Sequence, residues 1–150
     1  MKNIFDKSVS NELIERINHL NANTPPQWGK MNVAQMLAHC NVAYELVYTN
    51  KHPKPNAFMR FVIKLFGKSV VTSDTAYKKN ITTAPVFLVA KQQDFELEKQ
   101  RLIDFINQTQ SLGSEHFELK ESHSFGKLTA KEWSNMFYKH LDHHLTQFGV

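Results

Sequence analysis

Apolar residues recur at steps of three and four in four separate stretches of this chain, the periodicity of an α-helix that buries one side. The stretches run from about Asn11 to Asn21, Asn32 to Thr49, Ala90 to Gln110, and Thr129 to Phe148. Only residues 82–90, TTAPVFLVA, have the composition of a short strand, and Pro85 favours a connection there instead. The pattern therefore predicts an all-α fold, a four-helix bundle.

Residues that start and end helices lie at the borders of these stretches. Ser10 is a candidate N-cap for the first helix and Asn32 for the second. Thr129 opens a threonine-x-x-glutamate capping box before the last helix. The sequence SLGS, residues 111–114, is expected to close the third helix, and Gly149 is expected to end the fourth.

The length of 150 residues fits a single domain that spans residues 1–150. The one cysteine, Cys40, excludes an intrachain disulfide and fits a reducing compartment. The first twenty residues lack the pattern of a signal peptide, and no stretch approaches the length of a membrane span. We therefore expect a cytoplasmic protein.

Positive charge is concentrated between the second and third helices. Residues 51–80 contain seven lysines and arginines against Asp74 alone, a net charge of +6, whereas the whole chain carries +4. No glycine loop that would bind phosphate and no recognition-helix motif accompanies these charges, so we expect no nucleic-acid partner. A basic run of this kind is most often a solvated face.

Within this basic region, residues 56–71 form an amphipathic segment. Arg60, Lys64 and Lys68 recur every four residues, which places them on one side of a helix, and apolar residues cover the remainder. Such a helix can lie on a membrane surface. It can also be a short extra helix in a long crossover, buried against the bundle with its lysines in water. The second interpretation is favoured, so membrane contact is not expected.

The closing stretch carries three histidines within five residues. Its apolar side consists of Trp133, Met136, Phe137, Leu141, Leu145 and Phe148. His140 and His144 occupy the remaining steps of that side, so both rings should project toward the core, one turn apart. His143 lies about 60° around the helix from His140, on the border of the same face.

His39 has a similar place in the second stretch, between Met36 and Ala43 on the apolar side. Packing of the second helix on the fourth would bring His39 to the depth of His140 and His144. Buried imidazoles are neutral, and neutral imidazole nitrogens that converge are preferred ligands of divalent transition metals. The three histidines are therefore a candidate metal site with coordination positions left for water or substrate.

Other interpretations of these residues stay open at this point. The histidines can form a hydrogen-bonded polar cluster without a metal, or His143 can replace one member of the triad. Cys40 follows His39 directly, but its central place on the apolar side favours a core residue over a nucleophile. Gln35 and Gln147 can hydrogen-bond to the metal ligands or to a substrate and orient them, or they can hold the ends of helices.

The motif H-x-x-H-H-x-x-Q in the last helix, with a core-facing histidine in the second, resembles the DinB-like, or YfiT-like, superfamily of metal-binding four-helix bundles. WGKMNVAQMLAHC (residues 28–40) and SFGKLTAKEWSNMFYKHLDHHLTQFGV (residues 124–150) look like a subgroup of that superfamily without an assigned function. The two motifs, residues 28–40 and 124–150, cover 40 of the 150 residues, toward either end of the chain.

This resemblance implies a bundle with a long crossover between its second and third helices. It also implies a nickel, zinc or iron ion on His39, His140 and His144, and frequent homodimers. Some members of the superfamily transfer groups to or from low-molecular-weight thiols, or isomerise small acids with one.

Two hypotheses follow. The first is a metal-dependent hydrolase or thiol-linked transferase that acts on a small molecule, with His143 as the one local candidate for a general base. The second is a non-catalytic bundle that dimerises or binds an apolar ligand and keeps the histidines as a polar network.

Overall fold

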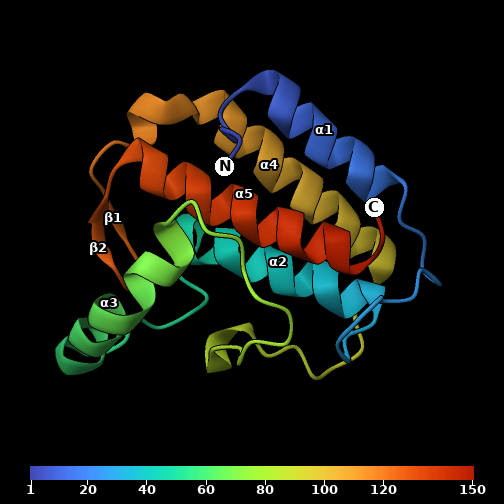
Figure 1. The fold of residues 1–150 in the computed structure, drawn as a ribbon, viewed down its shortest axis with the longest axis horizontal. Helices are drawn as coiled ribbons and strands as arrows, with labels where there is room; N and C mark the ends of the chain where they lie inside the picture. The colour runs from blue at the N-terminus through green and yellow to red at the C-terminus, as the bar shows by residue number, and fades with distance from the viewer.

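The computed structural model describes residues 1–150 and is predominantly helical (Figure 1). The elements follow in the order α1 (Lys7–Asn18), α2 (Val33–Tyr48), α3 (Ala57–Thr72), the 3₁₀ turn η1 (Pro85–Phe87), α4 (Phe95–Phe117), β1 (Lys120–Ser122), β2 (Gly126–Leu128) and α5 (Ala130–Gln147). The predicted all-α class is thereby confirmed. None of these helices combines the length and the hydrophobicity needed to cross a membrane.

Helices α1, α2, α4 and α5 pack against one another and enclose the core, and Figure 1 shows them side by side along the length of the molecule. One cluster of 20 buried apolar residues fills the space between them. Tyr44 of α2 stacks on Phe137 of α5 with ring centroids 4.7 Å apart, and Trp133 stacks on Phe137 at 5.6 Å. The contact between Tyr44 and Phe137 joins α2 to α5, the two helices that carry the histidines.

The capping residues set the start of α2 and α5 as predicted. Asn32 and Thr129 each accept a hydrogen bond from the third backbone N–H of their helix and take part in a complete capping box. The first helix differs, because it begins at Lys7 after Asp6 rather than after Ser10. Ser10 lies inside α1, buried, and its hydroxyl donates to the carbonyl of Lys7 (3.1 Å).

The region around α4 differs most from the prediction. The helix begins at Phe95, and its regular backbone is interrupted at Gly113 (φ 71°, ψ 173°), within the SLGS sequence where its end is expected; a short helical segment then follows up to Phe117. The chain beyond Gly113 buries Phe117 completely against Trp133, and this contact holds the last turn on the core. The antiparallel hairpin of β1 and β2 then leads into α5, and its three-residue strands are too short to show a period of two in the sequence.

Helix α3 lies in the crossover between α2 and α4, as predicted, but the expectation that it is short and buried is wrong. It is as long as α2, and only Thr72 among its residues is buried. Figure 1 shows it reaching away from the other helices, beside the hairpin. Two of its three regularly spaced cations face the rest of the protein, where Arg60 pairs with Glu121 and Lys68 pairs with Glu132.

Candidate metal centre

The histidines come together because α2 and α5 carry them on facing sides. His39 lies one helical turn after Met36 and one before Ala43, which are buried, and His140 and His144 lie on either side of the buried Leu141. Since both helices are started by capping boxes, the phase of each helix, and with it the direction of each ring, is set from its first turn.

The three rings form a compact cluster. The centroid of the His39 ring lies 4.9 Å from that of His140 and 4.5 Å from that of His144, and the last two are 4.9 Å apart. One nitrogen from each ring can be chosen so that all three lie within 4.8 Å of one another. His39 and His144 are only 5% and 8% exposed, whereas His140 is partly exposed. The structure thus brings together the three residues that the sequence selects as candidate ligands.

Hydrogen bonds fix which nitrogen of His39 and His144 points inward. Nδ1 of His39 lies 2.9 Å from the carbonyl oxygen of Phe87, and a carbonyl can only accept, so Nδ1 carries the proton. Gln147 donates from Nε2 to the carbonyl of Trp28 (2.7 Å), which leaves its Oε1 to accept from Nδ1 of His144 (2.8 Å). In the neutral tautomer, Nε2 of both histidines therefore presents a lone pair to the interior.

His140 completes the cluster from the other side. Its Nε2 lies 2.9 Å from Nε2 of His39. Because Nε2 of His39 has a lone pair, His140 donates to it when only protein atoms are present. A cation at this point would take the place of that one proton.

Burial keeps the cluster uncharged. Desolvation lowers the pKa of His140 well below its usual range, and the neighbouring His144 and His39 lower it further. Desolvation also lowers the pKa of His144 to about 3, with a smaller effect of His39. The pKa of His39 falls for the same reason, although its bond to Phe87 opposes the shift. The imidazoles are thus neutral at physiological pH, the form that binds a metal.

Aromatic side chains cover the cluster. The ring of Phe87, in η1, lies 5.3 Å from that of His39 and 5.6 Å from that of His140. Phe87 therefore contributes both a carbonyl that orients His39 and a ring that shields the site. Sequence reasoning missed this residue, because it lies 48 positions from His39 in a segment with no helical period.

His143 lies beside the triad rather than in it. Its ring centroid is 5.1 Å from that of His144, 5.8 Å from that of Trp28 and 5.7 Å from that of Tyr77. It is half-buried, and desolvation lowers its pKa. Trp28 thus packs at the rim of the site rather than in the bundle core, and the amine of Lys79 lies 4.1 Å from the centre of its ring.

The two glutamines have different roles. Gln147 contacts His144 directly and accepts from its Nδ1, one of the two roles that the sequence leaves open for it. The side chain of Gln35 instead accepts from the backbone N–H of Asn32 (3.1 Å), so it belongs to the capping box at the start of α2. Gln35 therefore does not orient the histidines but holds the start of a helix, the other of its two expected roles.

Cys40 is a core residue, as the sequence favours. It is 1% exposed, its sulfur lies 3.8 Å from that of Met36, and burial raises the pKa of its thiol far above the usual value. A thiol in this state does not act as a nucleophile.

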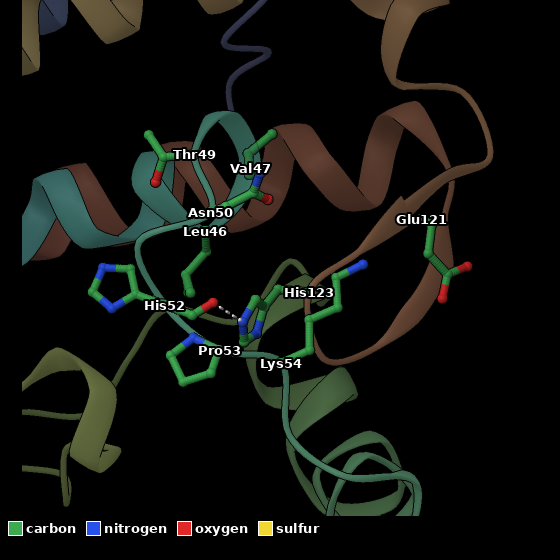
Figure 2. Close-up of a pocket in the computed structure, with 9 residues that line it drawn as sticks. All are labelled: Leu46, Val47, Thr49, Asn50, His52, Pro53, Lys54, Glu121 and His123. Atoms are coloured by element: carbon green, nitrogen blue, oxygen red, sulfur yellow. Dashed lines mark hydrogen bonds between the residues drawn. The ribbon is translucent and has the colours of Figure 1, made fainter.

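Two surface cavities of about 360 Å³ each lie near α2. Figure 2 shows the first, where His52 and His123 meet at the end of α2; Nε2 of His123 lies 3.3 Å from the carbonyl of His52, and none of the triad lines the cavity. The second lies between α2 and residues 86–91. Val86 and Leu88 line it while Phe87, between them, contacts His39, so η1 separates this cavity from the histidines.

The comparisons with known proteins give a family for this chain. No curated protein and no solved structure matches it. A family model described as a protein of unknown function, DUF1569, matches residues 5–149, a range that includes all three histidines and nearly the whole length. The chain therefore belongs to the DUF1569 family.

Proposed function

We propose that this protein is a metal-dependent enzyme of the DinB-like type, in which His39, His140 and His144 bind one divalent transition-metal ion. Helices α1, α2, α4 and α5 would be the four-helix bundle of that superfamily, and residues 49–94 its long crossover. The observation that carries the proposal is the convergence of three neutral imidazoles, of which His39 and His144 are buried and have their inner lone pairs set by outer hydrogen bonds.

The residues fit such an ion. At the usual metal–nitrogen distance of roughly 2.1 Å, two nitrogens bound to the same metal lie at most about 4.2 Å apart. The three ring nitrogens here lie within 4.8 Å of one another, so a movement of the rings by about an ångström would let all three reach one ion. Three imidazoles suit nickel, zinc or iron. No carboxylate of the chain belongs to the cluster, so the ion's charge would stay available to a substrate.

The reaction would be hydrolysis of a small molecule or a transfer to or from a low-molecular-weight thiol. A metal ion held by three histidines lowers the pKa of a bound water or thiol and polarises a substrate oxygen. The chain's own residues would orient the ligands through Phe87 and Gln147 and limit access of water through the rings of Phe87, Trp28 and Tyr77. His143, half-buried beside His144, would accept or return a proton at its ring.

One observation favours the second hypothesis, a non-catalytic bundle. Nε2 of His140 and Nε2 of His39 already lie at hydrogen-bonding distance, 2.9 Å, so the cluster can satisfy part of its own polar atoms without a metal. The two hypotheses differ in what happens when a metal is supplied.

Elemental analysis and thermal unfolding of the untagged protein distinguish them. We expect one nickel, zinc or iron ion per chain, and stabilisation by about 2.7 kcal/mol when the free metal is at a hundredfold excess over Kd. His39→Ala should lose both effects, and His123→Ala, which lies outside the cluster, should keep them. If His39→Ala retains the metal, or if added metal leaves the unfolding temperature of the wild type unchanged, the proposal fails.

A further inference from the structure

The outer side of α3 carries six of the thirteen large apolar residues that the fold leaves exposed. We define the α3 face by its exposed residues Phe58, Met59, Phe61, Leu65, Phe66 and Val70. Phe58, Phe61 and Phe66 are 75%, 65% and 71% exposed. With the three other residues they present on the order of 600 Å² of apolar surface, at the top of the range for the largest patch on a soluble monomer, and patches of that size usually bind something.

The orientation of α3 is enforced by its charged side. The guanidinium of Arg60 donates to Glu121 (2.6 Å), and the amine of Lys68 lies 2.8 Å from Glu132. Between them, Gly67 lies so close to the ring of Phe125 that a side-chain carbon at Gly67 would stand 3.4 Å from it. An amphipathic helix in an ordinary protein turns its apolar side inward, whereas α3 docks through Arg60 and Lys68 and leaves most of its large apolar side chains exposed.

The C-terminal end of α3 is bound just as firmly. Lys139 of α5 is 1% exposed, and its amine donates to the carbonyls of Val70 (2.7 Å) and Ser73 (2.8 Å). Asn135, one turn earlier, donates to the carbonyl of Thr72 (2.8 Å). A buried cation at the C-terminus of a helix compensates the partial negative charge there. These contacts make the outward direction of the α3 face a fixed property of the fold.

The charge around the α3 face indicates what it contacts. No acidic residue occurs between Glu45 and Asp74, and Lys54 and Lys64 are exposed. Lys51, Arg60 and Lys68 are paired with glutamates from other parts of the chain, whereas the exposed Lys54 and Lys64 have no acidic partner. A symmetric contact between two copies of α3 would therefore bring unpaired lysines together. An apolar surface bordered by uncompensated lysines instead matches the acyl chains and anionic headgroups of a lipid surface.

We propose that α3 is an interfacial helix that docks this protein on an anionic membrane surface, with the α3 face in the acyl-chain boundary and Lys54 and Lys64 among the headgroups. The rest of the protein would stay above the headgroups, held to α3 by Glu121, Glu132 and Lys139. This role is independent of the histidine centre.

Flotation of the full-length protein with vesicles tests the proposal. We expect binding to vesicles of phosphatidylcholine with phosphatidylglycerol, little binding to phosphatidylcholine alone, and loss of binding in about 0.5 M salt. The double variant F61S/F66S should bind the anionic vesicles at least about tenfold more weakly, because two aromatic rings no longer enter the bilayer. Leu97→Ser on α4, where Leu97 is 58% exposed, is the matched control and should bind like the wild type.

Folding and self-association need to be followed in the same samples. Because Phe61 and Phe66 are exposed, the double variant should keep the wild-type circular dichroism and thermal unfolding. His39→Ala should bind vesicles like the wild type, which separates this proposal from the metal centre. Failure of the wild type to bind anionic vesicles, equal binding by F61S/F66S, or a dimer in light scattering that F61S/F66S abolishes would each overturn the proposal.

Discussion

Helix α2 contributes to two buried polar clusters, and the cost of removing polar groups from water is compensated differently in each. The first is the histidine centre at His39. The second is centred on Glu45, six residues further along, which is 2% exposed and accepts hydrogen bonds from Lys51 (2.8 Å), His52 (2.7 Å) and Arg101. Arg101 also pairs with the buried Glu98 (2.8 Å).

In the Glu45 cluster the chain supplies both signs of charge. Although burial alone would raise the pKa of Glu45, the hydrogen bonds from Lys51, His52 and Arg101 lower that pKa to about 2. In the histidine cluster the chain supplies only neutral lone-pair donors. A buried cluster that contains its own counter-ions needs no ligand to be stable. A cluster of converging lone pairs without a cation is instead suited to bind a cation.

The strongest test of this contrast removes the internal cation. Arg101→Ala leaves Glu45 and Glu98 buried with fewer partners, and breaking a buried pair typically costs 3–5 kcal/mol. Because a third of the Arg101 side chain is exposed, we expect a loss near the lower end, about 3 kcal/mol in urea unfolding. Metal binding should not change. A loss below about 0.5 kcal/mol would mean that water replaces the guanidinium and that the cluster is not self-sufficient.

The pH dependence of stability tests the role of the Glu45 carboxylate in its cluster. A carboxylate with a lowered pKa stabilises the fold above its ordinary pKa of 4.5, and this contribution disappears as the pH falls toward 2. For Glu45 we expect a loss of about 2 kcal/mol across that interval, after allowance for the water that reaches Lys51. Glu45→Gln should be less stable than the wild type at pH 7 and should lose less on acidification. Parallel pH profiles for the two proteins would rule out Glu45 as the source.

The three histidines could be predicted from the sequence because the side of a helix on which a residue lies depends only on its near neighbours in the chain. His39, His140 and His144 each lie at a step of three or four from buried apolar neighbours, and caps at Asn32 and Thr129 begin the helices where the pattern indicates. Phase predicts which rings face the core. It does not show that Phe87 reaches His39, because that contact depends on the path of a 46-residue connection between α2 and α4.

The orientation of α3 shows a second limit of periodicity. The spacing of Arg60, Lys64 and Lys68 establishes that the helix has two unlike sides, but it cannot say which side docks. That choice depends on Glu121 in β1 and Glu132 in α5, which meet α3 only in the folded chain. The hairpin that carries Glu121 is itself too short to be recognised by periodicity.

The smallest effect that we predict is on metal affinity, and it distinguishes the role of Gln147 from that of Gln35. Gln147→Ala removes the acceptor for Nδ1 of His144, and loss of such an outer partner typically weakens metal binding by about 10–100-fold. Gln147→Glu keeps an acceptor for His144 while losing the donor to the carbonyl of Trp28, so metal affinity should recover part of the loss. Calorimetric titration with nickel or zinc measures both.

Gln35→Ala is the matched control for this experiment. It breaks one half of the capping box at Asn32, so we expect a loss of about 0.5–1 kcal/mol in unfolding free energy and an unchanged metal affinity. If Gln147→Ala behaves like Gln35→Ala, with lower stability and full affinity, then Gln147 serves only to hold the end of α5 to Trp28. The inner lone pair of His144 would then be set by the metal rather than by the fold, and the histidine centre would be less preorganised than its hydrogen bonds indicate.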